Sequence, residues 1–225
     1  ALDFKNRLAE VGLTAQHGKT VHLVAHSMGG LVSRWMIEKE GGNNIIQHLV
    51  MLGTPNNGSP WPKVKDWAAW AVTIGLSKIT LVGIPLLVLN YLMDGAKKAA
   101  ALDKVTDDMK PGSELLLSLA QSADPNVPYT VIAGNTTIML KNLPDATGKL
   151  QKILHNLGID HAHYQVLTQL LFREENDIAC SKTSMSHVPT PRTPLPQMII
   201  AACDHMSYFT TPEGKQKLMH TLRGL

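Results

Sequence analysis

The chain is short of cysteine, aromatic residues and charge. Its 225 residues include two cysteines, Cys180 and Cys203, with 5% aromatic and 17% charged side chains. Two cysteines do not make a disulfide framework, so cysteine content does not decide between an oxidising and a reducing compartment. A net charge of +3, without a lysine–arginine run or a pattern of stacking aromatics, argues against nucleic acid as a partner. No signal peptide is visible, but the chain begins at Ala1, so its location stays unknown.

The chain is rich in hydrophobic residues. Hydrophobic residues make up 44% of it, enough to bury a full core, and 225 residues fit one domain or one domain with an inserted cap. Unbroken apolar runs are typical of parallel strands covered on both faces, and here they alternate with segments of helical period. The pattern predicts strands at residues 21–24, 48–55, 128–135 and 196–203, helices at residues 1–18, 114–119 and from 212 onward, and a loop at residues 183–196.

A strand, a sharp turn and a helix follow one another around Ser27. The apolar run of residues 21–24 stops at a small residue, and helical spacing of apolar side chains begins at Leu31. Strand and helix backbones nearly touch at such a turn, so we expect Ala25 and Gly29 to supply the small residues that it needs. The turn lifts the serine hydroxyl off the sheet edge and leaves N–H groups at a helix N-terminus, where an oxyanion can be held.

The run Ala25-His26-Ser27-Met28-Gly29 resembles the nucleophile elbow of the α/β-hydrolase superfamily, in its lipase-like branch, with alanine in place of the usual first glycine. The resemblance implies an α/β-hydrolase fold, with a mostly parallel sheet, helices on both faces and a helical lid insertion. It implies a serine hydrolase that cleaves the carboxylic ester of a lipid or other acyl substrate through an acyl-enzyme intermediate. No cofactor is implied.

The same resemblance assigns the two partners of the serine. The acid is expected in a loop after a later strand, at Asp177, although Ile178 stands where the family usually has glycine. The base is expected just past the last strand, at His205. Asp204 is adjacent to this histidine, but neighbouring side chains on an extended stretch diverge. Asp160 is the reserve acid.

The oxyanion hole is expected to be shared with sequence that lies outside this chain. The Met28 backbone N–H is the first expected donor. In the resembled fold several strands come before the elbow, and a loop after one of them supplies the second donor. We therefore expect the chain to be covalently continuous with an upstream segment.

Residues 61–125 are expected to form the helical lid, between core segments at residues 1–60 and 126–225. Lys78, Pro85 and two glycines interrupt the apolar stretch within it, which favours short helices over a bilayer span. Trp67, Trp70 and Leu86 are the lid residues that we expect to contact substrate. Such a lid could touch a membrane surface, or could be a helical subdomain that buries its own core.

Three alternatives remain on the residues alone: a metal site, a module without hydrolysis, and acyl transfer to an acceptor other than water, which the same three residues permit. His161 and His163 could be metal ligands, but no carboxylate–histidine set at helical spacing completes them, so no metal is expected. The chain could also be a hydrolase-fold module of a larger protein, binding a lipid or a partner with little or no hydrolysis.

Overall fold

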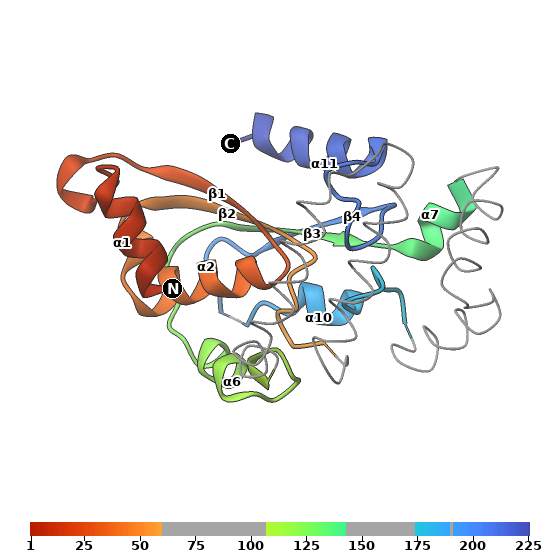
Figure 1. The fold of residues 1–225 in the computed structure, drawn as a ribbon, viewed down its shortest axis with the longest axis horizontal. Coiled ribbons are helices and arrows are strands. Elements are labelled where there is room, and N and C mark those ends of the chain that lie inside the picture. The colour runs from red at the N-terminus through yellow and green to blue at the C-terminus, as the bar shows by residue number, and fades with distance from the viewer. Residues whose placement is uncertain (60–106, 143–173, 190) are drawn as a thin grey trace, which may run out of the picture.

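A four-stranded parallel sheet is the centre of the chain (Figure 1). The computed structural model describes residues 1–59, 107–142, 174–189 and 191–225. The strands lie side by side in chain order: β1 (Val21–His26), β2 (Ile46–Leu52), β3 (Tyr129–Gly134) and β4 (Gln197–Ala201). All three pairings are parallel, and β1 is at one edge of the described sheet. The four strands predicted from the apolar runs are therefore present.

Helices cover both faces of this sheet. Figure 1 shows α11 on one side and α2 and α10 on the other. The described helices are α1 (Leu2–Glu10), α2 (Met28–Lys39), α6 (Glu114–Ala120), α7 (Thr136–Asn142), α10 (Lys182–Ser186) and α11 (Pro212–Arg223), with short 3-10 turns at Ala15–His17 and Gly42–Asn44. The first helix ends early in the predicted range, two residues before Gly12, which has a left-handed backbone (φ 78°).

Helix α10 corrects the expectation of an uninterrupted loop at residues 183–196. The Ser181 hydroxyl accepts a hydrogen bond from the Ser184 N–H (3.1 Å) and so caps the first turn. Met185 of this helix is fully buried in the core, which gives the turn an apolar anchor. One cap and one buried apolar side chain are too weak a sequence signal for a helix of five residues.

Alternate residues of β2 enter two different cores. Leu49 and Met51 pack in the cluster on the α2 and α10 side, whereas Val50 and Leu52 pack in the cluster beneath α11. All four side chains are fully buried. An apolar run without alternation is what a parallel strand covered on both faces requires.

A buried carboxylate ties α2 to the rest of the core. Glu38 accepts from Arg34 (Nε to Oε1, 2.9 Å), from Arg192 (Nη2 to Oε2, 2.8 Å) and from the Tyr129 hydroxyl (3.0 Å). Burial, and next the negative charge of Glu38, raise the pKa of Tyr129, so its phenol stays protonated and donates. This network lies away from the residues predicted to be catalytic.

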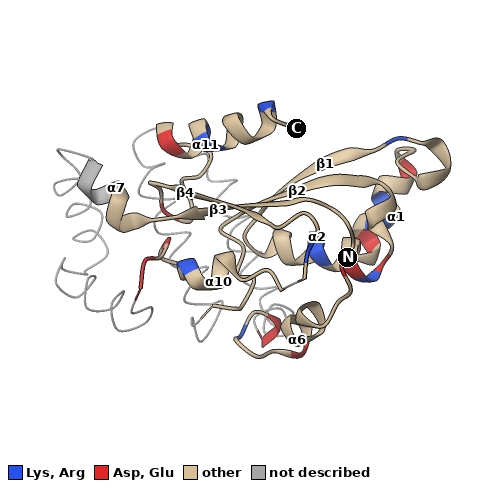
Figure 2. Ribbon diagram, turned by 180° about the vertical axis from the view of Figure 1, so that it is seen from behind, with Lys and Arg blue, Asp and Glu red and all other residues tan. Residues whose placement is uncertain are grey.

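The Lys, Arg, Asp and Glu residues of the described chain lie on the helices and connecting loops, and the four strands contain none (Figure 2). Both signs are interspersed on the described ribbon. Within the described part of the chain, no helix has the length and apolar character to cross a bilayer. The predicted division at residues 61–125 and the lid residues Trp67, Trp70 and Leu86 fall largely or wholly outside the described residues.

Candidate active site

Ser27 stands at the junction of β1 and α2 in a rare backbone conformation. Its φ is 55° and its ψ is −133°, a region that residues other than glycine seldom adopt. The Ser27 N–H donates to the Leu52 carbonyl (2.9 Å), so the turn is held by the neighbouring strand. Strain of this kind costs about 1–3 kcal/mol and is concentrated at functional sites. The side chain stays partly exposed at the carboxyl end of the sheet.

The close approach of helix to strand lies one residue later than predicted. A Cβ at Gly30 would lie 2.0 Å from Thr54 Oγ1, whereas a Cβ at Gly29 would meet no heavy atom of the described chain within 4 Å. Ala25 is buried and small, as expected. The expectation that Gly29 is the contact glycine is therefore wrong, because the α2 face that turns toward the loop after β2 is the face of Gly30.

Opposite stability changes are expected for alanine at the two glycines. Gly30→Ala should lower the free energy of unfolding by about 1–3 kcal/mol, because the buried Thr54 must shift. Gly29→Ala should leave it unchanged or raise it by up to about 1 kcal/mol, since alanine restricts the unfolded chain. Urea unfolding followed by circular dichroism measures both. Equal effects would contradict the assignment of the contact to Gly30.

His205 reaches Ser27 from the segment after β4. Its Nε2 lies 2.9 Å from Ser27 Oγ, although the two residues are 178 positions apart. The imidazole is fully buried. The His205 N–H donates to the Asp177 carbonyl (2.8 Å), which fixes the backbone on which the ring is mounted.

Asp177 completes a chain of hydrogen bonds through the imidazole. Its Oδ2 lies 2.7 Å from His205 Nδ1, and its Oδ1 accepts from the N–H groups of Ala179 (3.0 Å) and Cys180 (2.7 Å). Because a carboxylate only accepts, Nδ1 carries the proton and Nε2 is left to accept from the Ser27 hydroxyl. Ser27, Asp177 and His205 are thus brought together.

The residue after Asp177 has a backbone conformation that glycine adopts far more readily than isoleucine. Ile178 has φ 83°, a genuine outlier for a β-branched side chain. Its N–H donates to Asn176 Oδ1 (2.9 Å), and the turn directs the next two N–H groups at Asp177 Oδ1. The loop therefore keeps the geometry that glycine would provide, at the cost of local strain.

His26 supports the back of the imidazole. Its Nε2 lies 2.7 Å from the His205 carbonyl oxygen, so this nitrogen must be the donor. The two rings are stacked at a tilt, with centroids 4.8 Å apart. Burial, and next the charge of His205, lower the pKa of His26, which favours the neutral ring beside the His205 imidazole.

Three residues beside the acid were not singled out by the sequence. A Cβ at Gly53 would lie 2.8 Å from Asp177 Oδ2, and one at Gly134 would lie 2.7 Å from the Asp177 Cβ. The Tyr208 hydroxyl lies 2.8 Å from Asp177 Oδ2. The available signal was that β2 is followed directly by a glycine and β3 ends on one, at the sheet edge where His205 was expected.

Asp204 and Asp160 are the two other carboxylates that the sequence analysis considered. The Asp204 carboxylate accepts from the Met206 N–H (2.9 Å), in its own turn, whereas Asp177 is the acid at the imidazole. The reserve acid Asp160 and the histidines His161 and His163 lie outside the described residues.

Asp177, Cys180 and His205 have potential ligand atoms within 4.8 Å of one another. The Nδ1 and carboxylate atoms of this group are already joined by a hydrogen bond of 2.7 Å, and a Cβ at Gly53 would lie within 2.9 Å of both. Burial, and next the charge of Asp177, raise the pKa of the Cys180 thiol, so it is neutral. The group is therefore better described as a hydrogen-bonded dyad with a packed thiol than as a metal site.

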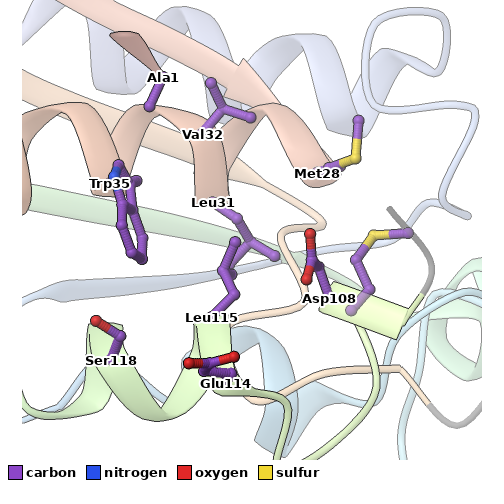
Figure 3. A pocket seen from close by; sticks show the side chains of 10 residues that line it. Ala1, Met28, Leu31, Val32, Trp35, Asp108, Glu114, Leu115 and Ser118 are labelled. Atoms are coloured by element: carbon purple, nitrogen blue, oxygen red, sulfur yellow. The ribbon is translucent and has the colours of Figure 1, made fainter. Parts of the chain in front are cut away.

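An apolar cavity of about 510 Å³ runs beside α2 (Figure 3). Met28, Leu31, Val32 and Trp35 line it from α2, and Leu115 faces them from α6. Two carboxylates, Asp108 and Glu114, contribute its polar atoms together with Ser118. Met28, which lines the cavity, is the first residue of α2 and follows Ser27 directly in the sequence.

Comparisons with solved structures return α/β hydrolases. Lipase BlEst2 of Bacillus licheniformis in its mature form is 18% identical, with a TM-score of 0.44 over 97% of this chain and 69% of that one. MGS-M2, an α/β hydrolase enzyme from a Medee basin deep-sea metagenome, is 14% identical, with a TM-score of 0.44 over 99% and 70%. The deformylase Nfo of Pseudomonas putida is 12% identical, with a TM-score of 0.42 over 92% and 68%.

The parallel sheet, covered by helices on both faces and carrying the serine turn after β1, is an α/β fold, as the sequence predicts. A search of curated proteins gave no match. A family model, however, matches residues 4–223 and so spans nearly the whole chain. The chain therefore belongs to the DUF7379 family, described as a domain of unknown function.

Proposed function

We propose that this chain is a serine hydrolase that cleaves carboxylic esters through an acyl-enzyme intermediate. The observation that carries the proposal is the unbroken set of hydrogen bonds from Ser27 Oγ through the His205 ring to Asp177 Oδ2, at 2.9 and 2.7 Å. A serine hydroxyl is a weak nucleophile until a base takes its proton, and here the base lies within hydrogen-bond reach.

In the proposed first step Ser27 Oγ attacks the ester carbonyl while His205 Nε2 takes the hydroxyl proton. Asp177 holds the Nδ1–H tautomer and stabilises the imidazolium that forms. His205 then gives the proton to the leaving alcohol, and the acyl group stays on Ser27. A water molecule, deprotonated by the same imidazole, releases the acid and restores the hydroxyl.

The tetrahedral intermediate needs donors for its negative oxygen. Met28 is the first residue of α2, and the first N–H groups of a helix have no acceptor within the helix. Its N–H is the donor that we assign to the oxyanion hole; each such donor is worth about 10²–10³ in rate.

The substrate class proposed is an acyl ester, with lipid esters as the first candidates. The apolar cavity that Met28 lines supports an apolar acyl or alcohol group near the serine. The apolar composition of residues 61–101 supports a lid of the kind expected from the sequence, including contact with a lipid surface.

A fluorophosphonate probe tests the proposal directly. We expect the native protein to be labelled on Ser27, as located by peptide mass spectrometry, and heat-denatured protein to stay unlabelled, because only the folded site activates the hydroxyl. Turnover of short and long acyl esters should accompany labelling. A native protein that neither reacts nor turns over esters would favour the alternative of a binding module without hydrolysis.

A further inference from the structure

Tyr208 lies against the acid with its hydroxyl proton directed at the carboxylate. The side chain is fully buried, and its oxygen lies 2.8 Å from Asp177 Oδ2. The Gly134 N–H donates to the same phenol oxygen (2.7 Å), so the phenol accepts from the strand and donates to the acid. Met185 Sδ, at 3.6 Å, is a far weaker acceptor than a carboxylate.

This phenol fills the last acceptor position of the acid. Oδ1 of Asp177 already accepts from the N–H groups of Ala179 and Cys180, and Oδ2 accepts from His205 Nδ1. With Tyr208 the carboxylate has four donors, which is its full capacity. Tyr208 and His205 therefore share one oxygen, and each hydrogen bond draws on the same negative charge.

We propose that Tyr208 is a positioning residue that sets the basicity of His205 by sharing Asp177 Oδ2 with it. The inference rests on the proposed serine hydrolase function and deepens it. By holding part of the carboxylate's charge, the phenol weakens the attraction between Asp177 and the imidazolium. The imidazole then holds the proton that it takes from Ser27 less tightly, which favours its transfer to the leaving alcohol.

The other groups around the imidazole do not carry this role. His26 faces the ring from the end of β1 and donates to the His205 backbone rather than to Asp177. Cys180 faces it from the acid loop, and burial raises the pKa of that thiol. Burial, and next the charge of Asp177, raise the pKa of Tyr208 well above its usual value, so the phenol remains a donor throughout the working range.

Tyr208→Phe removes the donor while keeping the ring. The freed charge on Asp177 then stabilises the imidazolium more strongly. A hydrogen bond to a charged group is worth about 1–2 pH units, and only part of this reaches the imidazole through the shared oxygen. We therefore expect the acid limb of the kcat/KM–pH profile to move to higher pH by about 0.5–1 unit. KM should change little, because the phenol is buried behind the acid and does not reach the substrate side.

Tyr129→Phe is the matched control. Tyr129 is also buried, and its hydroxyl also donates to a buried carboxylate, that of Glu38, at 3.0 Å. Its loss should destabilise the fold in the same way but leave the pH profile in place. Equal profiles for the two variants, both folded, would overturn the proposal and leave Tyr208 as a packing residue.

A fluorinated tyrosine at position 208 keeps the test decisive if Tyr208→Phe does not fold. Fluorine makes the phenol a stronger donor, so the acid limb should move to lower pH, opposite to the phenylalanine variant. If the acid limb of the kcat/KM–pH profile of this variant coincides with that of the wild type, the proposal is overturned.

Histidine titration by NMR, assigned with a His205→Gln variant, gives a readout without turnover. The pH at which the His205 resonance titrates is expected to rise in Tyr208→Phe and to fall in the fluorotyrosine variant. Absence of ester hydrolysis and of fluorophosphonate labelling would refute the proposed function. If the protein is active but the titration midpoint of the His205 resonance is the same in all variants, only the role proposed for Tyr208 is refuted.

Discussion

Ser27→Ala is expected to lower kcat for ester hydrolysis by about 10⁴- to 10⁶-fold while leaving the fold intact. Without the hydroxyl, His205 Nε2 has no nucleophile to deprotonate, and only residual stabilisation of the oxyanion remains. The rate on short and long p-nitrophenyl acyl esters measures the loss. Thermal unfolding should be close to that of the wild type, since the alanine keeps the Cβ and the backbone bond to Leu52.

Ser33→Ala is the control on the same helix. Ser33 is buried, and its hydroxyl donates to the Gly29 carbonyl (2.8 Å), away from the imidazole. Its variant should turn over esters at a rate near that of the wild type. Turnover that survives in Ser27→Ala, or that is lost equally in both variants, would contradict the role assigned to Ser27.

Asp177→Asn is expected to lower kcat by about 10⁴-fold, because the loop dictates which way the amide faces. The N–H groups of Ala179 and Cys180 both point at the Oδ1 position, so the amide oxygen must lie there. The NH₂ group then faces His205 Nδ1, which must become the acceptor. Nε2 carries the proton instead and cannot take one from the serine.

Asp204→Asn provides the comparison beside the same histidine. The Asp204 carboxylate accepts from the Met206 N–H (2.9 Å), a bond that an asparagine oxygen can keep. We expect near wild-type turnover for this variant, measured by the same ester assay at the same pH. A larger loss in Asp204→Asn than in Asp177→Asn would move the role of the acid to Asp204.

The strands and the serine turn were predictable because their signals are local. The apolar run before Ser27 and the helical spacing after it lie within sixteen residues of sequence, and the structure places β1 and α2 there. The short helix α10 was missed because its cap and its one buried apolar side chain do not make a periodic pattern.

The acid and the base were placed by resemblance, and the structure brings both to Ser27. Asp177 was the harder assignment, because Ile178 removes the glycine that marks this loop. The loop keeps its geometry nevertheless, because Asn176 Oδ1 accepts from the Ile178 N–H and Asp177 Oδ1 accepts from the next two backbone N–H groups. Which glycine of α2 lies against Thr54 could not be read from the motif, which contains two in a row.

Hydrophobic period and one short motif, both local properties, were enough to determine a parallel α/β chain with a serine on a strand-to-helix turn. Tertiary structure alone decided that Tyr208, Gly53 and Gly134 surround Asp177, and that the acid holds four donors. Such contacts join atoms far apart in sequence, and their distances depend on how strands of the sheet align at one edge. The types of the residues do not by themselves predict how the strands align, so these contacts could be found only in the folded structure.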